Sequence, residues 1–512
     1  MMKICLIRPS RFMVLSAITM NPAPPLGLAF VAAVLRAEGH QVKVIDSIAE
    51  APNQINPLVD KYVSNGLSMA EIAALIPEDT DVIGVSCMFS MNWIVDRALI
   101  DFLGEKFPKA VLIAGGEHIT AAPDFSLQQA KNLQVSVLGE AEETIVELIK
   151  AFEFKTALSN VKGIVFKDDQ GKCIHTEKRN RIKTLDEIPY PAWDLLPVEA
   201  YQENNMVYGV TKERSLPILA SRGCPYTCTF CSNPVMWGKK YTIRTPQQVA
   251  TEIEFLYTQF QIKNFDFFDL TAILKKDWVV EFSSEIIKRG INITWQLPAG
   301  TRSEAIDREC AKALYLSGCR YLSYAPESGS PEILRIIKKK IKLSRMLESM
   351  RFAYEEKLHI KLNMIFGLPD ERHIDIWKTY WFLIQCSWIG VHEIGPSSFQ
   401  PYPGSALFNR LVNEGKINME TDQYFFEMVK SDNFFQNSFY NDNMSIRWMQ
   451  FYQILGIVIF YVSNFLFRPS RFFKLLRGVI TRDYNSKLEA ALVALFTRNR
   501  FNAKTLKPAV EV

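Results

Sequence analysis

Residues 221–231 read Ser221-Arg222-Gly223-Cys224-Pro225-Tyr226-Thr227-Cys228-Thr229-Phe230-Cys231, which places three cysteines in the pattern CxxxCxxC on one short loop. An apolar run, Leu216 to Ala220, directly precedes this loop and is predicted to be a strand. Three thiolates on one tight loop can hold three irons of a [4Fe-4S] cluster and leave the fourth iron open to a small-molecule ligand. Zinc is the main alternative, but a structural zinc site needs a fourth Cys or His at similar local spacing, and the next cysteines are the distant Cys310 and Cys319.

Strands and helices continue to alternate after the cysteine loop. Six short apolar runs are predicted to be strands: Leu216 to Ala220, Asn264 to Phe268, Ile293 to Leu297, Tyr321 to Tyr324, Lys361 to Phe366 and Val391 to Ile394. Such a series of βα units predicts a barrel or a partial (β/α)6 barrel. In a barrel of this kind the chemistry takes place at the carboxyl ends of the strands.

The part of the chain before the crossing to this barrel shows a second alternation. Its predicted strands are Lys3 to Ile7, Gln41 to Ile45, Val82 to Ser86, Val111 to Ala114 and Val135 to Leu138. Their β-branched, continuously apolar composition is typical of buried parallel strands. We therefore expect a doubly wound α/β domain, in which ligands bind in the loops after the strands.

These patterns divide the chain into four parts. We predict a doubly wound domain at residues 1–150, a linker or crossing segment at 151–215, the partial barrel at 216–410 and a helical C-terminal region at 411–512. The sequence Ile188-Pro189-Tyr190-Pro191-Ala192-Trp193-Asp194 favours an ordered crossing over a flexible linker.

The cysteine loop after the first strand of the predicted barrel resembles the radical S-adenosylmethionine superfamily, over most of residues 1–410. The resemblance implies that the open iron chelates S-adenosylmethionine, and that one electron from the cluster cleaves it to methionine and a 5′-deoxyadenosyl radical. It makes Cys224, Cys228 and Cys231 the metal ligands. The other cysteines are expected to be dispensable for the cluster: Cys5, Cys87, Cys173, Cys310, Cys319 and Cys386.

The resemblance also assigns residues near the loop to the S-adenosylmethionine site. Phe230 matches the aromatic residue that packs near the adenine, although a buried loop aromatic is the alternative. Relatives carry an acidic motif for the methionine amino group at the end of the second strand. Asp269 is the better match than Asp266, because it lies nearer the strand end. The usual paired-acid form is absent here.

Two later strand ends match further parts of that site. Glu327 and Ser328 correspond to the segment that binds the methionine carboxylate or the ribose, with a helix N-cap as the alternative for Ser328. The sequence Asn363-Met364-Ile365-Phe366-Gly367-Leu368-Pro369-Asp370-Glu371 resembles the adenine-contacting segment, in which Gly367 permits close approach of the backbone, with an ordinary strand-to-helix turn as the alternative. Trp295 and Arg302 flank the end of the third strand and are weaker candidates, since Arg302 can equally be a surface charge.

The N-terminal domain resembles the cobalamin-binding branch of the same superfamily, whose first domain is flavodoxin-like. Five segments carry this resemblance: Pro24-Pro25-Leu26-Gly27-Leu28, Gly39-His40, Asp46, Ala114-Gly115-Gly116-Glu117-His118 and Leu138-Gly139-Glu140-Ala141-Glu142-Glu143-Thr144. The resemblance makes Gly115, Gly116 and Gly139 cobalamin-binding candidates, because glycines after strands permit close approach of the backbone to a large cofactor.

One motif of cobalamin-binding proteins is missing. The pattern DxHxxG, which supplies a histidine ligand to cobalt, does not occur, so the residue below cobalt is not identified. His118 is as readily a locally hydrogen-bonded loop histidine as a ligand. A retained domain without cofactor is the structural alternative, since a fold alone does not fix function.

Together these resemblances imply an oxygen-sensitive radical enzyme with three cofactors: a [4Fe-4S] cluster, S-adenosylmethionine and cobalamin. The implied reaction is methyl transfer to an unactivated carbon of a small-molecule or lipid substrate. The alternative within the branch is oxidative ring closure or rearrangement without methyl transfer, as in relatives of the anaerobic magnesium-protoporphyrin ester cyclase. A non-catalytic cofactor-binding or sensing protein is the alternative of another class, but it would not need an intact cysteine loop. No residue that controls the substrate radical can be named.

Composition sets the remaining expectations. The 59 Lys and Arg against 55 Asp and Glu give a net charge of +4, too small to indicate nucleic-acid binding. Clustered cysteines and the absence of a signal-like start favour the cytoplasm, with a flavodoxin or ferredoxin as electron donor. The apolar segment Tyr452 to Phe467 falls short of a bilayer span, so no transmembrane helix is predicted. Because its apolar residues occur all round, we expect it to be buried against the barrel, with contact to a membrane interface as the alternative.

Overall fold

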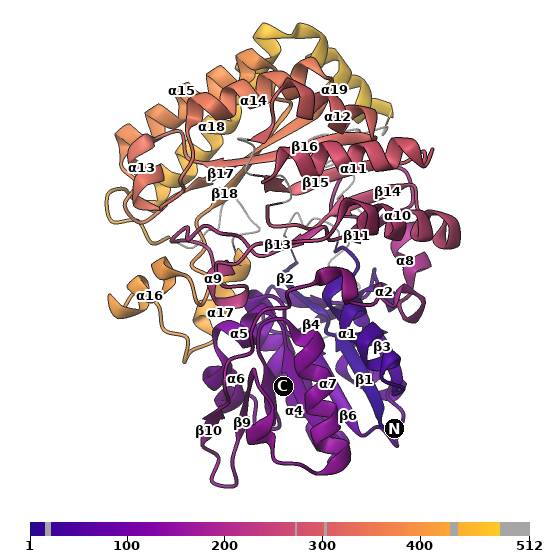
Figure 1. The fold of residues 1–512 in the computed structure, drawn as a ribbon. Coiled ribbons are helices and arrows are strands. Elements are labelled where there is room, and N and C mark those ends of the chain that lie inside the picture. Colours follow the sequence, from indigo (N-terminus) through magenta and orange to yellow (C-terminus); the bar gives the residue numbers. More distant parts are fainter. Residues whose placement is uncertain (16–21, 272–273, 302–304, 431–438, 482–512) are drawn as a thin grey trace.

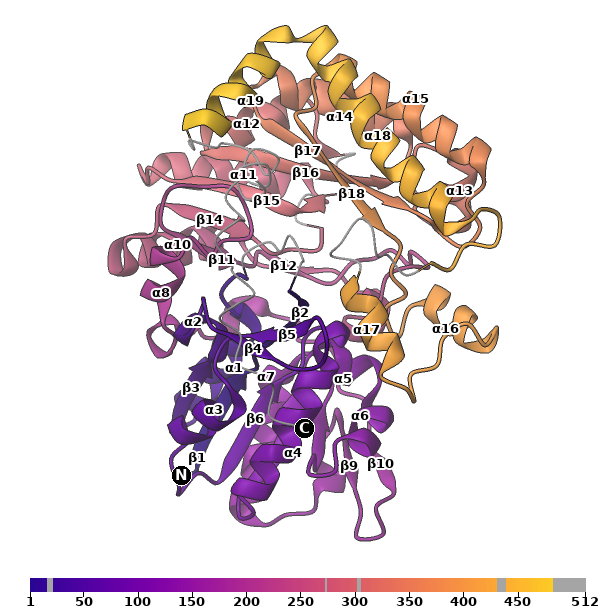
Figure 2. The ribbon, with the colours of Figure 1, turned by 180° about the vertical axis from the view of Figure 1, so that it is seen from behind.

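The computed structural model describes residues 1–15, 22–271, 274–301, 305–430 and 439–481 (Figure 1). An N-terminal α/β domain lies below a larger α/β domain, and C-terminal helices run along the outside of the larger one (Figures 1 and 2). Arg302 and residues 482–512 lie outside the described residues.

The N-terminal domain is built on one sheet with the order β10-β9-β8-β7-β6-β1-β3. Its strands are β1 (Lys3–Arg8), β3 (Gln41–Asp46), β6 (Val82–Ser86), β7 (Val111–Gly115), β8 (Val135–Val137), β9 (Ile164–Lys167) and β10 (Cys173–His175). The five neighbouring strands β8, β7, β6, β1 and β3 are parallel. Strand β9 pairs antiparallel with β8, and β10 pairs antiparallel with β9. The sheet therefore extends past residue 150, into the predicted crossing segment.

Strand alternation explains the two covered faces of this sheet. Ile4 and Leu6 of β1 pack in one core cluster with α1 (Leu26–Ala37) and α7 (Ala141–Phe154). Cys5 and Ile7 pack in a second cluster with α4 (Trp93–Lys106). Successive side chains of a strand point to opposite faces, so a strand covered on both sides must be apolar throughout.

The second domain has a six-stranded parallel sheet with the order β11-β14-β15-β16-β17-β18. Its strands are β11 (Ser215–Ile218), β14 (Asn264–Phe267), β15 (Thr294–Thr301), β16 (Cys319–Glu327), β17 (His359–Phe366) and β18 (Glu393–Ser398). The covering helices are α10 (Pro246–Phe260), α11 (Lys276–Lys288), α12 (Arg308–Leu316), α14 (Leu343–Glu355) and α15 (His373–Ile389). Among the described strands β18 does not pair with β11, so this is an open, partial barrel, as predicted.

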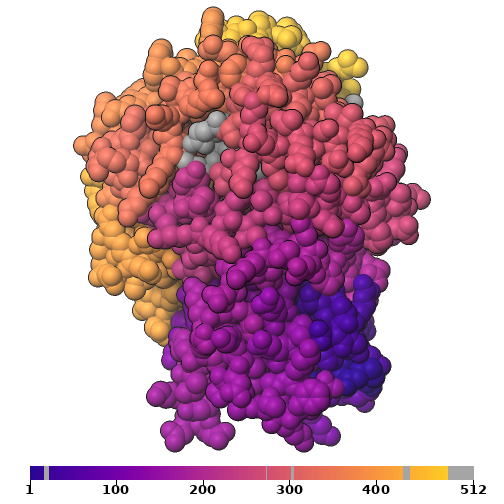
Figure 3. Space-filling model, in the orientation of Figure 1, coloured from indigo at the N-terminus to yellow at the C-terminus, as the bar shows by residue number. Residues whose placement is uncertain are grey.

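The two domains and the C-terminal region share packing surfaces. Trp193 of the crossing segment is buried in a core cluster that contains residues of both domains. On another side, Val429 of α17 (Gln423–Lys430) packs with Phe12 and Tyr62 of the N-terminal domain. In the space-filling view the domains meet without an open gap on this face (Figure 3).

The C-terminal helix α18 (Ile446–Phe467) differs from the expectation in length and burial. It has 22 residues, because it begins before the predicted segment, and by length and composition it could cross a bilayer. Only 28% of its most apolar window is buried. Its buried residues form one stripe along α15: Met449, Tyr452, Gln453, Gly456, Phe460 and Asn464. The helix therefore packs against the barrel, as predicted, but only along one side, because the neighbouring helices do not cover the others.

Candidate functional site

The cysteine loop begins at a tightly held strand end. Asp269 accepts hydrogen bonds from the backbone N–H of Ala220 at 3.1 Å and from the N–H and hydroxyl of Ser221. Gly223 has φ +83°, and a Cβ there would overlap the carbonyl oxygen of Lys240. Only glycine therefore fits the turn that leads from β12 (Ser221–Arg222) into the loop.

None of the three thiols of the loop forms a disulfide within the described residues, and all three are only partly buried. Burial raises the pKa of the Cys231 thiol to about 12. Among the described residues, no three His, Cys, Asp or Glu side chains converge closely enough to hold a single metal ion. Each thiolate of a four-iron cluster binds a different iron, so these three sulfurs need not converge on one point. The donor set therefore fits a cluster.

The far side of the loop is held by backbone contacts with later elements. Thr229 donates its N–H to the carbonyl of Ile337 at 3.0 Å and accepts from Leu407 N–H at 2.8 Å. These bonds place the cysteines beside the chain that follows β16. Glu327 is the last residue of that strand, and Ser328 is the first residue after it.

A buried ion pair stands next to the cysteines. Lys339, 9% exposed, lies with its ammonium 2.8 Å from Glu327 and 5.8 Å from the ring centre of Phe230. Glu327 is 7% exposed and has φ +69°, a conformation rare outside glycine. The structure thus brings together Phe230 and Glu327, and it adds Lys339. Sequence reasoning missed this lysine because Lys338-Lys339-Lys340 reads as an ordinary solvated charge run.

The carboxyl group of Asp269 is engaged by the chain itself. Its burial raises its pKa to about 6, against the lowering effect of the hydrogen bonds from Ser221 and Ala220. Contact between Asp269 and a cofactor stays a prediction; in the structure this residue fixes the start of the cysteine loop.

Ser328 is likewise engaged in a turn. It is fully buried, its hydroxyl lies 3.3 Å from that of Thr379, and it accepts the N–H of Ser330 at 3.1 Å. Gly329 donates its N–H to the Thr379 hydroxyl at 3.0 Å. The turn after β16 is therefore clamped onto α15, and this clamp sets the position of Glu327.

Gly367 lies at the end of β17, beside the C-terminal region. It has φ +79°, and its N–H donates to the Glu371 carboxylate at 2.8 Å. A Cβ on Gly367 would lie 2.5 Å from the sulfur of Met449 in α18. Burial raises the pKa of Glu371 to about 8. The glycine is thus required by the backbone and by the close packing of α18, and its contact with adenine stays a prediction.

The carboxyl edge of the N-terminal sheet combines glycines with exposed apolar side chains. A Cβ at Gly116 would lie 2.5 Å from the carbonyl of Cys87, whereas one at Gly115 would find ordinary contacts. The adjacent Met88 and Phe89 are 41% and 60% exposed. An exposed apolar platform beside uncrowded backbone fits the face of a large planar cofactor, so these residues fit cobalamin.

His118 does not reach this edge. It is buried, its Nδ1 lies 2.9 Å from the Ser90 hydroxyl, and its ring packs 4.7 Å from that of Trp93. Burial lowers its pKa to about 3, so it is neutral. The structure gives it the locally bonded role.

The same edge touches the chain directly after the cysteine loop. Glu117 bonds with the hydroxyl of Ser232, the residue after Cys231. Gly139 lies against the carbonyl of Met236 in α9 (Asn233–Met236), to which its Cβ would be 3.6 Å. The loops after β7 and β8 and the loop of cysteines therefore face one shared region.

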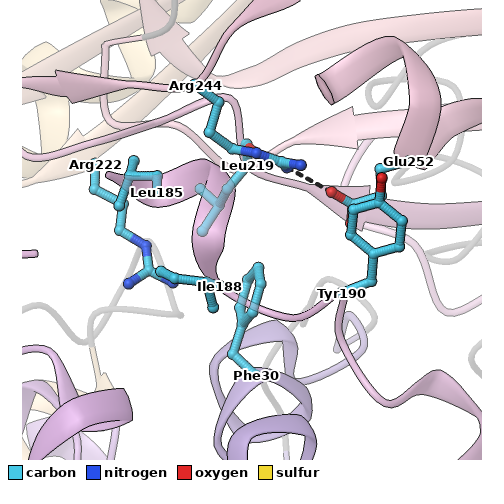
Figure 4. A pocket seen from close by; sticks show the side chains of 8 residues that line it. All are labelled: Phe30, Leu185, Ile188, Tyr190, Leu219, Arg222, Arg244 and Glu252. Atoms are coloured by element: carbon cyan, nitrogen blue, oxygen red, sulfur yellow. Dashed lines mark hydrogen bonds and ion pairs between the residues drawn. The ribbon is translucent and has the colours of Figure 1, made fainter. Parts of the chain in front are cut away.

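A buried set of ion pairs, here called the ionic joint, connects the two domains beside that region. Arg222 pairs with Glu140 at 3.2 Å and with Glu142 at 2.6 Å, and all three side chains are at most 9% exposed. Figure 4 shows that Arg222, together with Phe30 and Arg244, lines a pocket between the domains. Arg244 pairs with Glu252 there, so the charges of this pocket are already matched within the protein. We regard it as part of the domain joint.

Two parts of the chain match known families. Residues 218–383 match the Radical SAM superfamily, and residues 19–149 match the B12 binding domain.

Three relatives extend over most of the chain. An uncharacterized methyltransferase of Pyrococcus horikoshii is 30% identical over 429 residues, covering 83% of this chain and 86% of that protein. The cytidylyl-2-hydroxyethylphosphonate methyltransferase of Streptomyces wedmorensis is 27% identical, with 78% and 80% covered. The anaerobic magnesium-protoporphyrin IX monomethyl ester cyclase of Cereibacter sphaeroides is 25% identical, with 77% and 61% covered.

A solved structure shares the fold of both domains. The radical S-adenosylmethionine methyltransferase TsrM from Kitasatospora setae, with cobalamin and a [4Fe-4S] cluster bound, aligns with a TM-score of 0.62 at 16% identity. The alignment covers 81% of this chain and 75% of TsrM. The predicted fold of both domains is thereby confirmed.

Proposed function

The chain belongs to the cobalamin-binding radical S-adenosylmethionine enzymes, and from this premise we propose that it transfers a methyl group to an unactivated carbon of a small-molecule or lipid substrate. When bound, the [4Fe-4S] cluster with S-adenosylmethionine supplies a carbon-centred radical, and cobalamin supplies the methyl group. The observation that carries the proposal is the contact of Glu117 and Gly139 with the chain just after Cys231. This contact supports the proposal, because the implied cobalamin site and the implied cluster site then lie next to each other.

The chain's own residues have distinct parts in this proposal. Cys224, Cys228 and Cys231 hold the cluster, while Glu327 binds S-adenosylmethionine through oxygen atoms that accept hydrogen bonds. Lys339, which neutralises Glu327 in the structure, orients that carboxylate. Gly115 and Gly139 leave the backbone open to cobalamin, and Gly116, which packs against the carbonyl of Cys87, fixes the turn beside them.

The first test is an elemental analysis of one anaerobic preparation made with cobalamin supplied. We expect about four irons and one cobalt per chain, the composition of one cluster and one corrinoid. Iron without cobalt would reduce the N-terminal domain to a scaffold and refute methyl transfer through cobalamin.

Two matched variants test the ligand set. Cys228→Ala should lose most of the iron and all S-adenosylmethionine cleavage. Cys173→Ala, which changes another partly buried cysteine, should keep both. Full iron content and cleavage activity in Cys228→Ala would refute the assignment.

Oxidative ring closure without methyl transfer is the second candidate, favoured by the similarity to the ester cyclase. S-adenosylmethionine labelled with ¹³C in its methyl group separates the two. Label in the product supports methyl transfer, whereas a product that loses hydrogens and gains no label supports ring closure.

We further propose that the enzyme works in the cytoplasm, takes electrons from a flavodoxin or ferredoxin, and touches a membrane through its outer helices. Trp377, Trp381 and Trp388 of α15 are 54%, 63% and 67% exposed, and α18 exposes apolar side chains beside them. Aromatic side chains on one face are typical of interfacial attachment.

Sedimentation with phosphatidylglycerol-containing vesicles tests this contact. A Trp377→Ser, Trp381→Ser, Trp388→Ser variant should bind the vesicles at least tenfold more weakly than the natural protein. The exposed Phe154, at the end of α7 in the N-terminal domain, provides the control variant Phe154→Ser, which should bind like the natural protein. Equal binding of all three proteins would contradict the proposal.

A further inference from the structure

The backbone of the crossing segment, at Gly209 and Val210, closes the amino end of the partial barrel. The N–H of Gly209 donates to Asp266 Oδ2 at 2.9 Å, and the N–H of Val210 donates to Gln296 Oε1 at 3.1 Å. A Cβ at Gly209 would overlap the Gln296 side chain. The crossing segment therefore lies close against β14 and β15 and engages their inward polar side chains.

Above this closed end, β17 presents two polar side chains to the interior. Burial alternates along the strand: Ile360, Leu362 and Met364 are buried, whereas Lys361 and Asn363 are partly exposed. Because successive side chains of a strand point to opposite faces, Lys361 and Asn363 share one face. Across the sheet they are paired with Glu393 and Gly395 of β18.

Small residues on the neighbouring strands leave room for these two side chains. A Cβ on Gly395 would lie 2.7 Å from Lys361 Cε and 3.0 Å from Asn363 Oδ1. On the other side, a Cβ on Gly300 of β15 would lie 3.0 Å from Ala325 Cβ and 3.3 Å from Asn363 Nδ2. Lys361 and Asn363 thus extend over a lining of glycine and alanine.

Within the part of the chain that the structure describes, Glu393 is the one charged group that acts on Lys361, and it does so without direct contact. No ion pair or side-chain hydrogen bond is formed by the Lys361 ammonium or the Asn363 amide, and neither group is sealed from solvent. The nearest carboxylate along β18, Glu393, bonds with His359 Nε2 at 2.6 Å. Burial lowers the pKa of Lys361, and the charge of Glu393 only partly opposes this. A largely desolvated ammonium that makes no direct ion pair is stabilised by a ligand that pairs with it.

We propose that Lys361 and Asn363 bind an oxyanion group of the substrate, a carboxylate or a phosphate-type group, inside the partial barrel. An ammonium supplies charge and an amide NH₂ supplies directed donors, and together they match a group with several acceptor oxygens. This inference rests on the proposed function, whose substrate class it narrows to organic acids and phosphate or phosphonate esters.

The strand also sets the length of such a substrate. From Asn363 to Gly367, at the level of the implied S-adenosylmethionine site, β17 rises about 13 Å at roughly 3.3 Å per residue. The carbon that reacts is therefore expected about that far from the bound anion. Short acids such as acetate fill only the anion end of the site.

Anion binding can be measured without knowing the substrate. The probes are inorganic phosphate and acetate, titrated separately into cluster-loaded protein at constant ionic strength held with chloride. Trace acetylation of lysines, read by peptide mass spectrometry, reports the reactivity of each amine. We expect at least one anion to protect Lys361 in a saturable manner, and not to protect the exposed Lys288 of α11. Phosphate protection indicates a phosphate-type substrate, and acetate protection a carboxylate.

Three variants complete the test, with binding followed by calorimetry. Lys361→Met should bind the protecting anion at least tenfold more weakly, which corresponds to about 1.4 kcal/mol. Gly395→Ala keeps the charge but fills the space beside it, and should weaken binding as well. Lys288→Met is the matched control and should bind normally. Retained iron in each variant shows that it has folded.

Equal anion affinity in Lys361→Met and the natural protein, or the absence of protection by either anion, would overturn the inference. These readouts are independent of cobalt content and of S-adenosylmethionine cleavage. A protein that fails those two assays but still protects Lys361 would refute the proposed function and leave the anion site standing.

Discussion

Glu371 is a single residue whose protonation should be visible in stability. Burial raises its pKa to about 8 from 4.5, so the folded protein holds this proton more tightly than the unfolded chain does. Its stabilising contribution is complete below pH 4.5 and is lost as the pH rises towards 8. The Glu371→Gln variant stays neutral at every pH. Its free energy of unfolding, relative to that of the natural protein, should therefore increase by about 2 to 3 kcal/mol as the pH rises from 6 to 8.5.

Urea unfolding of both proteins at several pH values measures this difference. A constant difference between the two free energies of unfolding would show that Glu371 is ionised throughout the range, against the expectation from its burial.

Among the single residues of the candidate site, the sequence predicts only some. Cys224, Cys228 and Cys231 stand out because their chemistry needs a fixed spacing on one loop. Lys339 and Asn363 do not, because their role arises only when distant strands bring Glu327 and Gly395 beside them. A lysine in a basic run carries no local signal, and the sequence marks Asn363 only as the first residue of the segment that resembles the adenine contact.

Among the elements, the clamp between the β16 turn and α15 should control cofactor binding. Thr379→Val keeps the shape of the side chain but leaves the buried N–H of Gly329 without an acceptor. We expect a loss of about 2 kcal/mol in stability, the cost of an unsatisfied buried donor. Because the turn carries Glu327, affinity for S-adenosylmethionine should also fall.

The control for that variant is Thr258→Val on the exposed side of α10. Thr258 makes a hydrogen bond to the carbonyl four residues earlier, as Thr379 does, but supports no turn. Equal unfolding free energies and equal affinities for S-adenosylmethionine in the two variants would refute the clamp.

Elements also differ in how well the sequence predicts them. The parallel strands are confirmed in number and order, because a strand covered on both faces is apolar throughout and bounded by turns. Their ends are less exact, since β15 and β18 each extend four residues past the predicted ends at Leu297 and Ile394. The packing of α18 against the barrel is predicted but the small extent of its burial is not, since composition records how apolar a helix is and not how many neighbours cover it. Only the packing of α15 along one stripe decides that.

For the whole molecule, the joint of Arg222 with Glu140 and Glu142 should hold the domains together. Arg222→Met leaves the buried Glu142 without its ion-pair partner, whereas Glu140 keeps Arg181, and removal of one partner of a buried pair costs about 3 kcal/mol. We expect a lower Tm and weaker retention of cobalamin. Arg308→Met is the control, because Arg308 pairs with Glu355 on the surface, where such a pair contributes about 1 kcal/mol or less.

Adding Glu142→Gln to Arg222→Met should restore part of the lost stability, since it removes an unpaired charge. If Arg222→Met is as stable as Arg308→Met, the joint does not hold the domains together.

The ionic joint also has a consequence for the order of events during synthesis. The N-terminal sheet is complete once His175 of β10 has left the ribosome, but Arg222 belongs to the chain that follows. Until then Glu142 lacks the partner it has in the finished protein and stays hydrated. The nascent first domain thus presents a charged, hydrated edge, and the emergence of β12, just after the first strand of the barrel, converts that edge into an interior.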